Sequence, residues 1–147
     1  RSMIYFAYGS LMNRSGLADL CPRAEPLRCA RISNHCLAFT GSSSQWGGGV
    51  ATIRLAPGRD VWGALYEVDE ECRRAIERSG EADGYVWAWT QVMDEEGERI
   101  RAGLLVKVRH LEAASPSPEY LDVLRQASTQ WGLAAEDFES GASSENV

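Results

Sequence analysis

The pattern of apolar and polar positions predicts a mixed, strand-rich chain. An apolar and aromatic run from Met3 to Tyr8 stops at Gly9-Ser10, which predicts a buried strand and then a tight turn, because glycine tolerates the positive φ that such turns often need. Amides just beyond a strand end lack a guaranteed ladder partner, so this turn is a candidate site for an anion or oxyanion. Further strands are expected at 28–39, 50–55, 61–68, 85–93 and 101–108, with a Ser/Gly-rich loop at 41–49 and turns at 56–58 and 94–97.

Helical signals occur in three places. Residues 14–20 can form one or two helical turns. Asp69 is a helix cap followed by apolar residues at i, i+3 and i+4, which predicts a helix from Glu70 to about Arg78 that Gly80 stops. The last helix is expected after Ser115–Pro118 and ends at Gly132, and a short helix at 134–138 is a further expectation.

Composition narrows the function class. A chain of 147 residues with 44% hydrophobic and 24% charged residues is typical of one soluble globular domain. We expect this domain at 3–140, an expression scar at 1–2 and a flexible tail at 141–147. A net charge of −6 argues against nucleic acid or an anionic membrane as the main partner, and no apolar run approaches the roughly 20 residues of a membrane span. With no signal peptide visible, a cytoplasmic location is expected.

The four cysteines show neither CxxC spacing nor histidine companions at metal-ligand spacing. We therefore expect no metal and interpret Cys21, Cys29, Cys36 and Cys72 as reduced thiols of a cytosolic protein, with a disulfide as the alternative.

Four ordered stretches carry a family resemblance: YFAYGSLM at 5–12, GGVATI at 48–53, VWGALY at 61–66, and PSPEY at 116–120 followed by WGL at 131–133. From Ile4 to about Phe138 the chain resembles the γ-glutamylcyclotransferase-like (AIG2-like) family. The resemblance implies an α+β fold, a mixed β-barrel or sheet flanked by a few helices. It also implies an enzyme in which the α-amine of a γ-glutamyl substrate attacks its own γ-carbonyl, which yields 5-oxoproline and a free amine without any cofactor.

The resemblance also implies site residues. The positions matching the family's substrate contacts are Tyr5, Phe6, Ala7, Tyr8, Gly9, Ser10, Leu11 and Tyr120. Within this set the backbone of Gly9 and Ser10 is expected to donate hydrogen bonds. Leu11 stands where many members carry asparagine, and this exchange removes a polar contact and indicates a different leaving group.

The acid/base glutamate of the family, in its EGxxxG pattern, is not where the resemblance places it. Counting forward from the VWG strand gives Gly80, and counting back from the second glycine of the pattern gives Ser79. Glu81 is the nearest carboxylate and is the expected catalytic residue, with Glu77 and Asp83 as alternatives.

Two function classes therefore remain open. The first is an enzyme that releases an amine or amino acid from a γ-glutamyl substrate, in a biosynthetic pathway. The second is a family member that has lost or moved its acid/base glutamate and binds a small ligand, or catalyses a different acyl transfer or cyclisation. In either class Trp46 is expected to cover a pocket or to plug the core, and Trp87 with Trp89 is a hypothesis for the wall of a pocket for a bulky amine.

Overall fold

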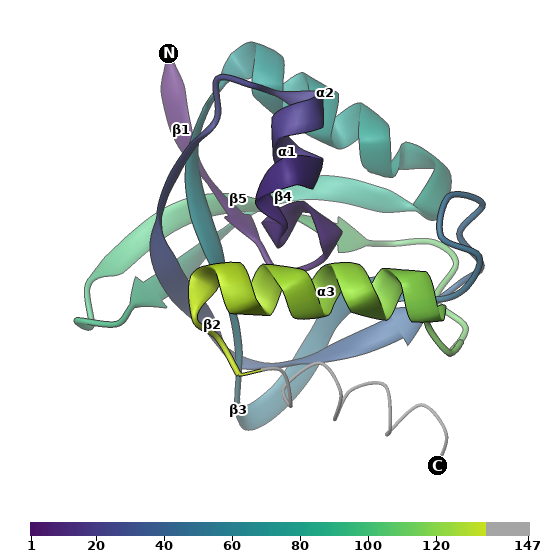
Figure 1. Cartoon of the computed structure of the whole chain (residues 1–147). Helices are drawn as coiled ribbons and strands as arrows, with labels where there is room; N and C mark the ends of the chain where they lie inside the picture. Colours follow the sequence, from purple (N-terminus) through teal and green to yellow (C-terminus); the bar gives the residue numbers. More distant parts are fainter. Residues whose placement is uncertain (135–147) are drawn as a thin grey trace.

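In the computed structural model, which describes residues 1–134, five β-strands close into a barrel and three α-helices pack around it (Figure 1). The strands are β1 Ser2–Ala7, β2 Glu25–Thr40, β3 Val50–Asp69, β4 Tyr85–Asp94 and β5 Arg99–Lys107. The helices are α1 Arg14–Leu20, α2 Glu70–Gly80 and α3 Pro118–Trp131, with short 3₁₀ helices η1 Ser10–Met12 and η2 Glu81–Asp83. In Figure 1 α2 lies along the top of the view and α3 across its middle, with α1 between them.

The strands follow the order β1-β3-β2-β4-β5 around the barrel. Neighbours pair antiparallel, except that β1 and β5 close the barrel with a parallel pairing of Tyr5 and Gly103. This arrangement confirms the expected α+β fold with a mixed barrel. The expected short helix at 134–138 lies almost wholly outside the described residues, and the expected tail at 141–147 lies entirely outside them.

The helices and the hairpin that were predicted from local sequence signals are confirmed. The carboxylate of Asp69 accepts a hydrogen bond from the Cys72 amide at 2.8 Å and so caps α2. The Ser117 hydroxyl accepts from the Tyr120 amide at 3.2 Å at the start of α3, which ends at Gly132 with a φ of 67°. β4 and β5 form the expected antiparallel hairpin.

The predicted turn at 56–58 is wrong, because β3 runs through it as one long strand. Gly58 has a φ of 83°, and its amide donates to the Asn34 side chain at 2.9 Å. The pairing register of β2 and β3 shifts between Ser33 and His35. Residues that usually mark a turn therefore form an irregularity inside the β2–β3 ladder.

Alternation along β1 divides the apolar residues into two clusters. Phe6 and Tyr8 belong to a cluster with contributions from all five strands, which fills the barrel. Tyr5 and Ala7 belong to the second cluster, which includes Leu17 of α1 and residues of α2 and α3 and lies between the barrel and its helices. The first strand therefore holds the barrel and the helices together at the point where the Gly9 turn begins.

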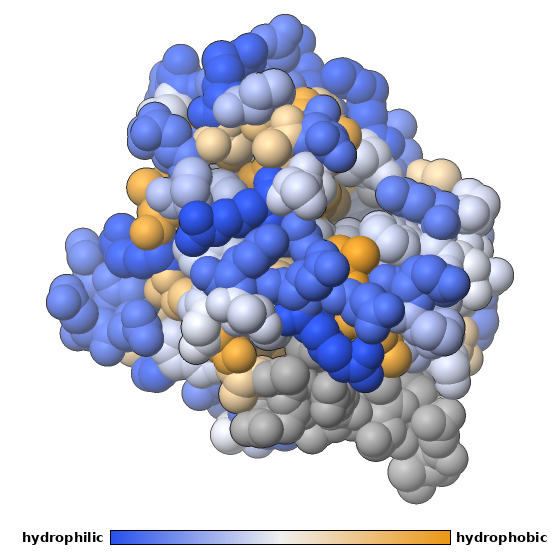
Figure 2. Space-filling view, viewed as in Figure 1, coloured by the Kyte–Doolittle hydropathy of each residue, from blue (hydrophilic) through white to orange (hydrophobic). Residues whose placement is uncertain are grey.

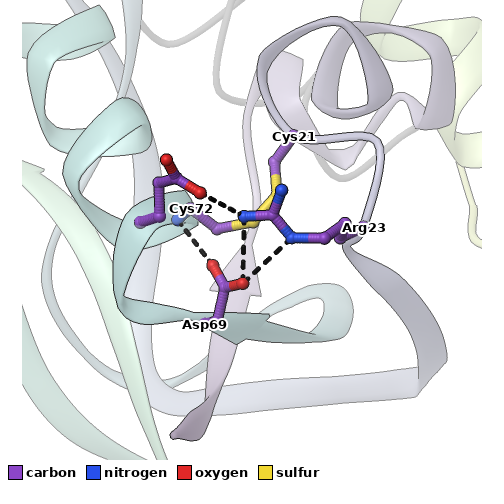
Figure 3. Close-up of a disulfide and its surroundings, with 5 residues drawn as sticks. Cys21, Arg23, Asp69 and Cys72 are labelled. Carbon is purple, nitrogen blue, oxygen red and sulfur yellow. Dashed lines mark hydrogen bonds and ion pairs between the residues drawn. A yellow bond between two sulfur atoms is a disulfide. The ribbon is translucent and has the colours of Figure 1, made fainter.

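A disulfide joins Cys21, at the end of α1, to Cys72 in the first turn of α2 (Figure 3). The prediction of four reduced thiols is thus wrong for these two, whereas Cys29 and Cys36 are free and buried. No sequence motif marks a pair 51 residues apart, because only the tertiary packing of the helices brings the Cα atoms to 5.5 Å. Such a bond is uncommon in cytosolic proteins, so it does not favour the expected cytoplasmic location.

Asp69 lies beside the disulfide, where its carboxylate forms an ion pair with Arg23 at 3.0 Å (Figure 3). Arg23 also pairs with Glu71 at 2.6 Å. The two sulfurs are bonded to each other and the carboxylate is paired, so these groups form a crosslinked helix junction instead of a metal site.

The surface seen in Figure 2 is mainly hydrophilic, with small hydrophobic areas that are separated from one another. Among residues 1–134 no helix has the length and apolar character needed to cross a membrane.

Candidate functional site

A cavity of about 380 Å³ opens where β1 ends. Its wall combines the Gly9 turn, α1, the loop between β2 and β3, the end of α2, η2 and α3. The sequence-predicted residues on this wall are Tyr5, Tyr8, Gly9, Ser10, Leu11 and Tyr120. A second cavity of about 320 Å³ shares Tyr8 but lacks the turn and Tyr120. The first cavity is therefore the candidate site.

The Gly9 turn differs from its predicted geometry, because Gly9 has a φ of −110° and does not use the left-handed region. A Cβ at this position would lie 3.5 Å from the Tyr120 hydroxyl, so a larger side chain would extend toward that group. The Met12 amide donates to the Gly9 carbonyl at 3.0 Å. Within residues 1–134 the amides of Gly9, Ser10 and Leu11 find no acceptor, and all three residues line the cavity, so this turn offers free donors there.

The Tyr120 hydroxyl faces this turn, and the residue is 1% exposed. Its hydroxyl accepts a hydrogen bond from the Ala51 amide at 2.9 Å, while the Tyr85 hydroxyl donates to the Ala51 carbonyl. Trp46 packs edge-on against Tyr120 with ring centroids 5.3 Å apart and also lines the cavity. The loop aromatic is therefore both a wall of the cavity and a support for its phenol.

Burial raises the pKa of the Tyr5, Tyr8 and Tyr120 phenols well above the usual value for tyrosine. Desolvation disfavours the phenolate, so these groups stay protonated at neutral pH. They can donate and accept hydrogen bonds in the cavity, but they are poor bases there.

The carboxylates of 77–83 are placed differently from one another. Glu81, the expected catalytic residue, is exposed and does not line the cavity, so its catalytic role stays a prediction. Glu77 pairs with Arg73 on α2. Asp83 is half-buried on the cavity wall and accepts a hydrogen bond from the Ser43 hydroxyl at 3.2 Å.

Several predicted residues lie away from the cavity. Phe6 and Ala7 are buried in the two apolar clusters. Trp87 stacks on Tyr5 with ring centroids 5.7 Å apart, and Trp89 is 44% exposed. Neither tryptophan lines the cavity, so the hypothesis that they form its wall is wrong.

Other wall residues were not identified from the sequence. Asn13 caps α1 through its bond from the Ser15 amide at 3.2 Å, and its side-chain amide donates to the Val123 carbonyl of α3 at 3.2 Å. An asparagine before a helical run is a cap signal that could have located it. Gln126, which also lines the cavity, carried no such signal.

Comparison with known proteins identifies the family. The model of the family described as gamma-glutamyl cyclotransferase, AIG2-like, matches residues 5–131. Human gamma-glutamylcyclotransferase is 31% identical over 141 residues, which cover 92% of this chain and 74% of the human protein. A solved gamma-glutamyl cyclotransferase structure superposes with a TM-score of 0.87 at 29% identity, covering 95% of this chain and 86% of the other. A yeast gamma-glutamyl cyclotransferase specific to glutathione has a TM-score of 0.65 at 16% identity, covers 99% of this chain and 96% of its own, and shares the fold. The chain therefore belongs to the AIG2-like gamma-glutamyl cyclotransferase family.

Proposed function

We propose that this protein is a γ-glutamylcyclotransferase that converts a small γ-glutamyl substrate into 5-oxoproline and a free amine or amino acid. The observation that carries the proposal is the run of unpartnered amides at Gly9, Ser10 and Leu11, three residues of the cavity wall. Two such amides can stabilise the oxyanion that forms when the γ-carbonyl is attacked.

The cavity supports the other requirement of the reaction, which is proximity. A volume of about 380 Å³ suits a small ligand and favours a folded substrate, in which the α-amine meets the γ-carbonyl. Both reacting groups belong to the substrate, so the proposed reaction uses no cofactor. The Tyr120 hydroxyl and the wall formed by Tyr5 and Tyr8 would contact the γ-glutamyl group.

The net charge of −6 supports a small molecule, in preference to nucleic acid or a membrane, as the partner. A cytoplasmic location and a role in biosynthesis stay predictions. Fractionation of cells that produce the protein tests the first of these.

The decisive experiment measures 5-oxoproline and the released amine from a panel of γ-glutamyl amines, γ-glutamyl amino acids and γ-glutamyl peptides. At least one substrate should give the two products in equal amounts. α-Glutamyl isomers of the same compounds are matched controls and should give none, because their amide is formed by the α-carboxyl group and they contain no γ-amide carbonyl. Absence of 5-oxoproline from the whole panel would overturn the proposal, and ligand binding without turnover would favour a small-ligand binding module.

A further inference from the structure

We propose that Asp83, in place of Glu81, is the carboxylate that transfers protons in this cavity; the inference rests on the function proposed above. Among residues 1–134, the cavity wall contains two carboxylates, Asp19 and Asp83. Glu81 belongs to the same 3₁₀ turn as Asp83, yet it is exposed and absent from the wall. A base must reach the proton that it removes, so position on the wall decides between them.

Asp83 is held in place by a short chain of hydrogen bonds. The Trp46 amide donates to the Ser43 hydroxyl at 3.2 Å, and that hydroxyl donates to Asp83 Oδ2 at 3.2 Å. Ser43 is 2% exposed, so this contact is sheltered from water. The loop that carries the Trp46 wall therefore also orients the carboxylate.

The backbone beneath Asp83 is equally constrained. Gly84 follows with a φ of 90°, and a Cβ there would lie 2.6 Å from the Arg109 carbonyl oxygen. The Gly84 amide donates to the Glu81 carbonyl at 3.1 Å, and the Gly84 carbonyl accepts from the Val108 amide at 2.9 Å. This glycine therefore fixes the turn formed by residues 81–84, in which Glu81 is exposed and Asp83 is half-buried.

The remaining candidate is less suited to proton transfer. Asp19 is exposed on α1, where solvent hydrates its carboxylate. Asp83 lines the same wall as Tyr120, and its charge adds to burial, the larger cause, in raising the pKa of the Tyr120 phenol. Asp83 therefore shares the cavity with the phenol that borders the Gly9 turn.

The proton balance of the reaction requires one group of this kind. Asp83 accepts a proton from the α-ammonium, and the freed amine attacks the γ-carbonyl to form the new C–N bond of the ring. The protonated Asp83 then donates to the leaving nitrogen as its bond to the γ-carbon breaks, and the regenerated carboxylate takes the second proton from the ring nitrogen and passes it to the leaving amine. One of the three ammonium protons stays on the lactam nitrogen, and the other two end on the leaving amine, which departs as its ammonium.

The test compares Asp83→Asn with Glu81→Gln, two isosteric changes that each remove one carboxylate from the same turn. Using the best substrate of the panel, we expect Asp83→Asn to lower kcat by 10²- to 10⁴-fold with little change in KM, as is typical for loss of a general acid–base residue. Glu81→Gln should retain the wild-type kcat. Equal melting temperatures of the two variants would show that folding is not the cause.

A second variant separates a chemical role from a structural one. Asp83→Ala should be inactive and should regain turnover when formate is added, because a small carboxylate can occupy the vacated volume. Wild-type kcat in Asp83→Asn, or loss in Glu81→Gln alone, would overturn the inference while the proposed function stands. A wild-type protein that releases no 5-oxoproline would instead contradict the proposed function, and the role of Asp83 with it.

Discussion

At the residue scale, the Tyr120 hydroxyl has both a structural and a functional task. It accepts the Ala51 amide at 2.9 Å in a buried position, so Tyr120→Phe leaves this amide without its partner. An unsatisfied buried donor costs about 1–3 kcal/mol, and we expect this loss in the free energy of unfolding measured with urea. Turnover should fall as well, because the hydroxyl borders the Gly9 turn.

Tyr66→Phe is the matched control. The Tyr66 hydroxyl donates to the Met12 carbonyl at 3.1 Å, but Trp131 Nε1 also donates there at 2.8 Å. The carbonyl keeps a partner in this variant, and Tyr66 does not line the cavity. The stability loss should be smaller and turnover unchanged. Equal losses of stability in the two variants would contradict the role given to the Ala51 contact.

At the scale of elements, the β4–β5 hairpin predicts a dependence of stability on pH. The Asp94 carboxylate is 3% exposed and accepts bonds from the amides of Glu98 at 2.9 Å and Glu96 at 3.0 Å, and from Arg28 at 3.0 Å. The Glu98 bond first, and then Arg28, lower the pKa of Asp94. Because the pKa of Asp94 is lower in the folded than in the unfolded protein, its ionised carboxylate stabilises the fold at pH values above the unfolded-state pKa of about 4. This contribution is lost as the pH falls through the pKa of the folded state.

The melting temperature should therefore drop below about pH 4 in the wild type. Asp94→Asn should show a weaker drop across that range and a lower melting temperature at neutral pH. Asp122→Asn, which changes an exposed carboxylate on α3, is the control and should follow the wild-type curve. A pH profile of Asp94→Asn parallel to the wild type would refute the assignment.

The Cys21–Cys72 disulfide predicts a redox dependence of stability. A crosslink between residues 51 apart lowers the entropy of the unfolded chain, which corresponds to about 4 kcal/mol in the loop-closure model. Addition of dithiothreitol should lower the urea midpoint accordingly. The double variant Cys21→Ala/Cys72→Ala should be insensitive to the reductant, whereas Cys36→Ala should respond as the wild type does. No response in the wild type would argue against the bond.

These elements also show what the sequence could predict. The α2 cap and the β4–β5 alternation are local signals, so both elements were predicted closely. The Gly9 turn and Tyr120 were located by motifs, and the structure brings them together. The orientation of Asp83 depends on Ser43, which lies 40 residues earlier in the chain. Counting residues along 77–84 cannot reveal a contact with so distant a residue. The same reason explains the missed disulfide.

At the scale of the whole molecule, the charges around the cavity predict a substrate preference. Within the described residues, the wall carries two carboxylates, Asp19 and Asp83, and neither arginine nor lysine. A leaving group with its own carboxylate is repelled there, whereas a neutral or cationic amine is not. We expect γ-glutamyl amines to have higher kcat/KM values than γ-glutamyl amino acids of similar size.

Asp19→Asn should lower the ratio of kcat/KM for γ-glutamyl amines to that for γ-glutamyl amino acids about two- to fivefold, since an exposed charge contributes up to about 1 kcal/mol. Glu95→Gln changes the net charge equally but lies in the exposed β4–β5 turn, so it should leave the ratio unaltered. The ratio of kcat/KM values for a paired amine and amino acid is the measurement. An unchanged ratio in Asp19→Asn would count against the effect of the wall charge.

The pairing that closes the barrel has a consequence for the way the chain acquires its structure. β1 pairs with β3 and with Gly103 of β5, so its partners come from segments far along the sequence. Contacts between distant segments slow folding, typically to milliseconds or seconds, because the loops between them must close first. During synthesis on the ribosome, both edges of β1 stay unpaired until β3 has emerged, and one edge stays unpaired until β5 follows.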